Sequence, residues 1–155
     1  MFSCNSRREF YPQSIPKPQI LMYMLDTNTI IYAMRHPGTD CYNNVRGHIG
    51  KDDLCISVIV YAELEFGIRN SMYPERNREA VNKILADIRI LDFDINAATH
   101  LGDILAYLRQ HNLMQGGSDR DKMIAAHARS LGYTVVTNNT KDFIHIPGVV
   151  IEDWR

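Results

Sequence analysis

Four carboxylate side chains follow apolar segments that lie far apart in the sequence, and their chemistry suits them to bind a divalent metal ion. They are Asp26, Glu63, Asp121 and Asp142. Ligands of a parallel sheet collect beyond the carboxyl ends of its strands, so these acids can converge on one edge. Carboxylates ~4 Å apart repel each other by several kcal/mol at intermediate dielectric, and Mg²⁺ or Mn²⁺ relieves that repulsion. Because such an ion also takes phosphate oxygens as ligands, the pattern favours phosphodiester hydrolysis.

Each of these acids also has a purely structural explanation. Asp26 is a good N-cap for a following helix, and Ser118 with Asp121 matches a capping box. Asp142 can cap its own short turn. Glu63 can form a surface salt bridge, although its apolar neighbours make an unpaired carboxylate costly there. Each structural explanation accounts for one residue, whereas a shared site accounts for all four.

Other catalytic chemistries lack their motifs in this chain. The six histidines form no H-E-x-x-H pair for zinc, and the chain has neither a G-x-x-x-x-G-K-[ST] nor a G-x-G-x-x-G phosphate loop. No serine lies in a G-x-S-x-G turn. A net charge of -1 excludes nucleic-acid binding through a basic field over the whole surface. Any contact with RNA must therefore be local.

The elements that must position the acids are apolar strands without alternation, separated by helices. This order predicts an α/β fold with a mainly parallel sheet covered by helices on both faces. The expected strands cover 20–25, 54–57, 90–93, 134–136 and 149–151. The expected helices cover 30–34, 58–69, 74–88 and 97–109, with another from about 121 and a short turn after 140.

The chain is long enough for one domain, expected at 21–155 after a flexible leader at 1–20 that contains three of the six prolines. The longest nearly apolar run, 54–62, is half of what spans a bilayer, and no signal peptide opens the chain. We therefore expect a soluble cytoplasmic protein. The cysteines Cys4, Cys41 and Cys55 are scattered, so we expect buried or incidental thiols rather than a zinc site or a disulfide framework.

Several motifs occur along the chain in a fixed order and spacing. They are Met-Leu-Asp-Thr-Asn at 24–28, Ser57 followed by Glu-Leu at 63–64 and Gly67, Asp-Lys-Met-Ile-Ala-Ala-His-Ala at 121–128, the segment 135–143 and the ending at 147–154. With these motifs, the segment from about 22 to 155 resembles the PIN-domain ribonucleases, specifically the VapC toxins of bacterial toxin–antitoxin pairs. The resemblance implies a PIN-like three-layer sandwich with a mainly parallel central sheet flanked by helices.

The resemblance also implies a metal-dependent nuclease site. Asp26, Glu63 and Asp121 match the three acidic positions of the family, and Asp26 and Asp121 are expected to be the principal Mg²⁺ ligands, with Mn²⁺ as a substitute. Some PIN domains have a further acid where this chain has Asn139, so that role falls to Asp142 or to an amide with water. The residues expected to support the acids and water are Thr27, Asn28, Asn138 and Asn139.

The implied partners are a VapB-like antitoxin that blocks the site, a second copy of the chain in a homodimer, and structured RNA such as tRNA, whose cleavage inhibits translation. A basic rim around the acids could contact RNA phosphates, although for any single cation a solvated face is favoured over RNA contact by roughly two to one. The candidate rim residues are Arg35, Arg69, Arg120, Lys122 and Lys141.

Two other functions remain open from the sequence. Asp26 follows a strand, as the nucleophile of an aspartate-dependent phosphatase does, but the second aspartate of such a motif is replaced by Asn28. Alternatively, the acids hold a regulatory cation in a non-catalytic interaction module. The first alternative predicts a phosphorylated Asp26, and the second predicts no turnover of any RNA.

Overall fold

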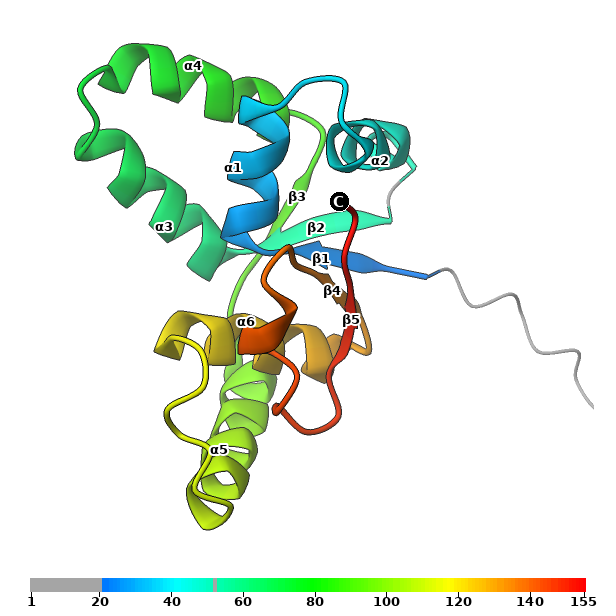
Figure 1. Cartoon of the computed structure of the whole chain (residues 1–155), viewed down its shortest axis with the longest axis vertical. Coiled ribbons are helices and arrows are strands. Elements are labelled where there is room, and N and C mark those ends of the chain that lie inside the picture. The colour runs from blue at the N-terminus through cyan, green and yellow to red at the C-terminus, as the bar shows by residue number, and fades with distance from the viewer. Residues whose placement is uncertain (1–20, 52) are drawn as a thin grey trace, which may run out of the picture.

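The computed structural model describes residues 21–51 and 53–155, which form a five-stranded parallel sheet with helices on both sides (Figure 1). The strand order is β3-β2-β1-β4-β5, and all four pairings are parallel. This confirms the expected α/β class with a parallel central sheet. The strands are β1 (Tyr23–Leu25), β2 (Leu54–Ser57), β3 (Arg89–Leu91), β4 (Thr134–Val136) and β5 (Val150–Glu152).

The helices form two layers. Figure 1 shows α1, α2 and α4 above the strands and α5 and α6 below them, with α3 beside α4 at one side. The α5–α6 pair makes the most extensive contact between any two elements that the structure describes. The helices are α1 (Thr27–Arg35), α2 (Asp40–His48), α3 (Val58–Arg69), α4 (Pro74–Leu85), α5 (Ile95–Gln110) and α6 (Asp119–Leu131), with the 3₁₀ turn η1 (Thr140–Asp142).

The central strands are buried because both faces of the sheet are covered. Every residue of β2 and β4 is buried, which explains their apolar runs without alternation. In the register of the sheet, Leu25 of β1 lies beside Ile56 of β2 and Val136 of β4. The residue that follows Leu25 is therefore level with the polar residues at the ends of both neighbouring strands.

Helix α2 was not predicted from the sequence. Its residues are mostly polar, and it buries only Cys41 and Val45. Two buried positions give too little apolar periodicity to indicate a helix. Thr39 nevertheless caps it through its hydroxyl, which accepts a hydrogen bond from the Tyr42 N–H at 3.4 Å.

The end of the chain packs onto α2 through an aromatic cluster of Tyr23, His48 and Trp154. The three ring centroids are each 5.0 Å apart, and His48 is stacked on Trp154. His48 Nδ1 lies 2.7 Å from Asp53 Oδ2, and the Trp154 indole N–H donates to Glu152 Oε2 at 2.9 Å. Burial and these two carboxylates raise the pKa of Tyr23. This cluster ties the C-terminal segment to both β1 and α2.

Several other expectations concern the rest of the chain. The leader expected at 1–20 lies outside the described residues, as does Cys4. Cys41 and Cys55 are buried free thiols, as expected. Within residues 21–51 and 53–155, no helix combines the length and the apolar character needed to cross a membrane.

Candidate active site

Asp26 lies at the carboxyl end of β1 and begins α1. Its Oδ1 accepts a hydrogen bond from the Thr29 N–H at 2.7 Å, so it is the N-cap of the helix. Its Oδ2 accepts a hydrogen bond from the Thr137 hydroxyl at 2.6 Å, which joins β1 to the end of β4. The side chain is only 1% exposed. Burial raises its pKa; the two threonine contacts oppose that rise and the negative charge of Asp121 adds to it.

Glu63 reaches the same region from the second turn of α3. One carboxylate oxygen accepts a hydrogen bond from the Thr27 hydroxyl, at the start of α1. The other lies 3.0 Å from Arg120 Nε, at the start of α6. The salt bridge anticipated as a structural explanation therefore exists, but it spans two distant segments of the chain. Glu63 connects the beginnings of α1 and α6.

Asp121 is held at the N-terminus of α6 by a complete capping box. Its Oδ2 accepts hydrogen bonds from the backbone N–H and the hydroxyl of Ser118, both at 2.7 Å. The Asp121 N–H in turn donates to the Ser118 hydroxyl at 3.2 Å. The structural explanations of Asp26 and Asp121 are thus both correct, and capping fixes the direction in which each carboxylate points.

Asp26, Glu63 and Asp121 line one cavity of about 310 Å³. Three segments that are distant in the sequence therefore bring their carboxylates to the same hollow at the carboxyl edge of the sheet. We call this hollow the acid cavity. It is lined by Asp26, Thr27, Asn28, Ile31, Glu63, Phe66, Ser118, Arg120 and Asp121.

The acid cavity offers the oxygen ligands that Mg²⁺ and Mn²⁺ prefer. Its carboxylates contact protein donors in this structure, and no three His, Cys, Asp or Glu side chains among the described residues are grouped closely enough to hold a metal ion. Arg120 carries the positive charge beside Glu63, while Ser118 satisfies one oxygen of Asp121. The donor set suits a hard cation by its chemistry, and binding one would require Glu63 and Asp121 to leave these contacts.

The fourth candidate acid lies beside the acid cavity rather than in its lining. Asp142, in η1, accepts a hydrogen bond from the side-chain amide of Asn139. Its backbone approaches Gly117 so closely that a Cβ on Gly117, whose φ is +64°, would be 2.7 Å from the Asp142 carbonyl oxygen. This contact presses η1 against the loop that carries Ser118. The side-chain N and O of Asn138 are buried without a hydrogen-bond partner among the described residues.

The five cations expected on a basic rim differ in exposure: one is buried and four lie at the surface. Lys122 does not belong to the rim, because it is 3% exposed and its ammonium donates to the carbonyl oxygens of Met114 and Gly117 at 3.1 and 3.3 Å. It holds the loop before α6. The other four cations stay near the surface: Arg120 at Glu63, Arg69 at Glu65, Arg35 in a neighbouring groove and Lys141 in η1.

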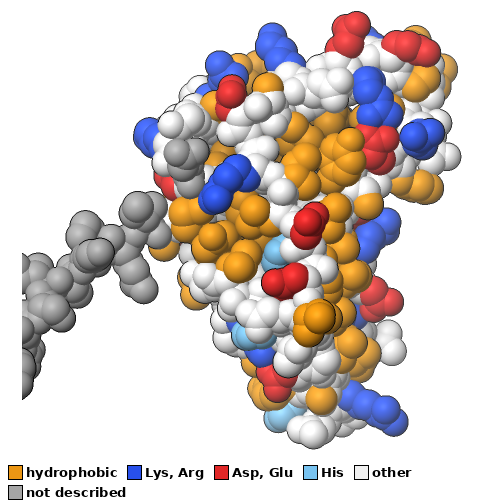
Figure 2. Space-filling view, turned by 180° about the vertical axis from the view of Figure 1, so that it is seen from behind, with side chains coloured by type: hydrophobic (Ala, Val, Ile, Leu, Met, Phe, Trp, Pro, Cys, Tyr) orange, Lys and Arg blue, Asp and Glu red, His pale blue; other side chains and the backbone are white. Residues whose placement is uncertain are grey.

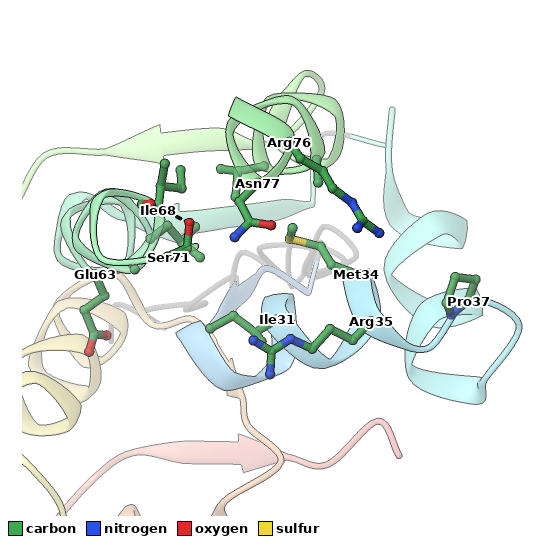
Figure 3. Close-up of a pocket in the computed structure, with 13 residues that line it drawn as sticks. Ile31, Met34, Arg35, Pro37, Glu63, Ile68, Ser71, Arg76 and Asn77 are labelled. Atoms are coloured by element: carbon green, nitrogen blue, oxygen red, sulfur yellow. Dashed lines mark hydrogen bonds between the residues drawn. The ribbon is translucent and has the colours of Figure 1, made fainter. Parts of the chain in front are cut away.

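A larger groove of about 600 Å³ runs beside the acid cavity, between α1, α3 and α4 (Figure 3). Ile31, Met34 and Val81 supply apolar side chains, and Arg35 and Arg76 supply positive charges. Figure 3 shows Glu63 at one end of this groove. Since Ile31 and Glu63 line both hollows, the groove leads directly into the acid cavity.

Sequence reasoning missed three residues of the site. Thr137 holds Asp26, although only its neighbours Asn138 and Asn139 were named as supporting residues. The parallel register of β1 and β4 places it there, and this pairing could not be read before the strand order was known. Ser118 and Phe66 line the acid cavity because they lie one helical turn from Asp121 and Glu63. That spacing is the signal that could have identified them.

Known proteins are similar to this chain in sequence and in fold. The family model of the PIN domain matches residues 23–149. The tRNA(fMet)-specific endonuclease VapC of Salmonella typhimurium is 40% identical over 135 residues, which are 87% of this chain and 99% of that protein. Ribonuclease VapC2 of Rickettsia felis is 35% identical over 134 residues, which are 86% of this chain and 98% of that protein.

Solved structures agree with these sequence matches. The crystal structure of VapBC2 from Rickettsia felis, bound to a DNA fragment from its promoter, contains a chain with a TM-score of 0.79 and 36% identity, covering 87% of this chain and 100% of that one. DNA-bound VapBC from Salmonella typhimurium gives a TM-score of 0.79 at 39% identity, with 87% and 99% coverage. The resemblance seen in the motifs is confirmed: the chain belongs to the PIN-domain family, among its VapC members.

Proposed function

We propose that this protein is a metal-dependent endoribonuclease that acts as the toxin of a toxin–antitoxin pair. The observation that carries the proposal is the convergence of Asp26, Glu63 and Asp121 on one cavity. Relatives that align over nearly their whole length are named ribonucleases or endonucleases. The acid cavity supplies the oxygen donors that such a reaction needs at a scissile phosphate.

The three carboxylates would hold Mg²⁺ or Mn²⁺, and the bound ion would polarise the phosphate and activate water for attack. Thr29 and Thr137 fix both oxygens of Asp26, so this ligand is positioned before any substrate arrives. Thr27 orients Glu63 in the same way. Asn28 lines the cavity with an amide that can hydrogen-bond water or a phosphate oxygen. Asp142 of η1, held by Asn139 at the start of that turn, would support the site from beside the cavity.

The relatives support proposals for the substrate and the antitoxin partner. One relative is named as specific for tRNA(fMet), which supports structured RNA, and tRNA in particular, as the substrate whose loss inhibits translation. The matching VapBC complexes support a VapB-like antitoxin. A segment of that antitoxin with apolar and acidic side chains suits the groove beside Glu63, from which it would cover the acid cavity. Apolar side chains gathered on the face shown in Figure 2 support a homodimer.

The phosphatase alternative fits the geometry less well. A nucleophilic aspartate must present a free oxygen to phosphorus. Both oxygens of Asp26 instead accept hydrogen bonds, and the side chain is buried. These contacts suit a positioned metal ligand better than an attacking group.

The test is cleavage of total tRNA by the purified protein in Mg²⁺, with a chelator as the first control. We expect Asp26→Asn to lower kcat/KM by about hundredfold or more, because one ligand charge is lost while the cap is kept. Asp94→Asn is the matched control, since Asp94 caps α5 through Ala97 N–H at 2.9 Å in the same way. Undiminished cleavage by Asp26→Asn, or cleavage that persists in chelator, would contradict the proposal.

A further inference from the structure

Phe66 is an exposed aromatic side chain in the lining of the acid cavity. It is 64% exposed, whereas the residues of α3 that pack into the core are Val60, Leu64 and Ile68. Single exposed apolar residues are common and need no explanation by themselves. Phe66, however, lies one helical turn after Glu63 and borders the same cavity as the three acids. Its ring is therefore available beside the proposed site of cleavage.

Arg120 supplies the positive charge in that lining. Among the described residues that border the acid cavity, it alone is cationic, and its side chain is 55% exposed. Its Nε contacts Glu63 Oε1 at 3.0 Å, and its other guanidinium N–H groups have no partner in the described part of the chain. A guanidinium can bind phosphate through two parallel hydrogen bonds. Arg120 differs in this from its neighbour Lys122, whose charge is buried and fully engaged.

An aromatic ring and an arginine in the lining of one cavity match the two parts of a nucleotide, its base and its phosphate. Bases stack on exposed aromatic side chains when they are unpaired, whereas bases inside a double helix are already stacked on each other. Phosphates pair with arginine whatever the base. Phe66 comes from α3 and Arg120 from α6, and both border the acid cavity. An unpaired base and its phosphate would therefore meet different side chains there.

We propose that Phe66 stacks on an unpaired base next to the scissile phosphate and that Arg120 binds a phosphate of the same nucleotide. Together they bind one nucleotide at the edge of the acid cavity. This inference rests on the proposed ribonuclease function. It adds to that function two residues that determine which RNA segments enter the acid cavity.

The experiment measures RNA binding directly, by fluorescence anisotropy, in a buffer with chelator so that no cleavage occurs. The probes are a short labelled single-stranded RNA of mixed sequence and the same strand annealed to its complement. We expect Phe66→Ala to weaken binding of the single strand by about tenfold, and Phe66→Trp to keep it, because stacking needs only an aromatic face. Binding of the duplex should not change in either variant.

Tyr73→Ala is the matched control, because Tyr73 is 60% exposed and aromatic but does not line the acid cavity. Arg120→Gln should weaken binding of both probes and make it less dependent on salt, since one phosphate contact is lost. Arg109→Gln, on the exposed surface of α5, is the control for simple loss of charge. Thermal unfolding of each variant checks that the fold is kept.

Equal binding of the single strand by the wild type and Phe66→Ala overturns the inference, as does an equal loss in Tyr73→Ala. An equal loss of duplex binding in Phe66→Ala also overturns it. Cleavage of tRNA separates this failure from that of the proposed function. If the wild type cleaves and Phe66→Ala cleaves equally well, only the inference is wrong. If the wild type binds the single strand through Phe66 but cleaves no RNA, the ribonuclease proposal is wrong and the stacking surface stands.

Discussion

The acid cavity and the aromatic cluster of Tyr23, His48 and Trp154 differ in how their carboxylates are compensated. In the cluster, the His48 ring lies beside Asp53 Oδ2 and the Trp154 indole N–H donates to Glu152, so each of these two rings has a carboxylate partner. The described lining of the acid cavity holds three carboxylates and one cation, Arg120, which contacts Glu63 alone among the three. The cluster is built as a stable joint for the end of the chain. The cavity keeps unbalanced negative charge, which is costly without a further cation and so indicates a binding site.

The largest expected effect is a loss of stability when the aromatic cluster is truncated. Trp154 is buried and contacts two other rings, so Trp154→Ala should lower the free energy of unfolding by about 3–5 kcal/mol. Trp154→Phe keeps a ring and should cost less. Both variants should retain the kcat/KM of the wild type for tRNA at a temperature where they are folded. Urea unfolding measures the stability, and cleavage assays measure kcat/KM. If a folded Trp154→Ala protein had an impaired kcat/KM, the cluster would contribute to catalysis as well as to stability, which contradicts the comparison.

A smaller effect concerns the pH dependence of stability at the cavity. Burial raises the pKa of Asp26 above its usual value, so the folded protein binds a proton more tightly than the unfolded chain. The contribution of Asp26 to the free energy of unfolding is therefore largest below about pH 4, the pKa of an aspartate in the unfolded chain. That contribution is lost as the pH rises through the pKa of Asp26 in the folded protein. In chelator, the wild type should gain stability relative to Asp26→Asn as the pH falls from neutral towards about 4.

Urea unfolding of both proteins over that pH range gives the difference directly. Asp153 shows the opposite behaviour, because Arg155 lowers its pKa, and Asp153→Asn is the control for the sign. If the wild type loses stability relative to Asp26→Asn on acidification, the folded protein favours the ionised form of Asp26 in chelator rather than disfavouring it. The contrast with the aromatic cluster would then fail.

The sequence predicted the parts of the molecule that depend on local pattern. Apolar runs located all five strands, and three of the four candidate acids, Asp26, Glu63 and Asp121, line the cavity at the carboxyl edge. Helix α2 was not predicted, because it buries only Cys41 and Val45 and so shows too little apolar periodicity. Its stability comes from tertiary contacts rather than from a periodic apolar face.

The site contacts that were missed depend on strand order and on which helix ends meet. Thr137 reaches Asp26 only because β4 pairs with β1. Arg120 reaches Glu63 only because α3 and α6 begin at the same edge. Lys122 was expected on the surface, but the loop before α6 turns back over it and supplies two carbonyl oxygens. No spacing along the chain contains that information.

The most direct test of the account is titration of the purified protein with Mn²⁺ alone, followed by calorimetry or by the spin resonance of free Mn²⁺. Asp26 and Asp121 come from segments far apart in the sequence and border one cavity. We therefore expect the wild type and Asp94→Asn to bind Mn²⁺ with the same affinity, and Asp26→Asn and Asp121→Asn each to bind it about tenfold or more weakly. Equal affinity in all four proteins would show that these carboxylates share no metal site, and the account would be wrong.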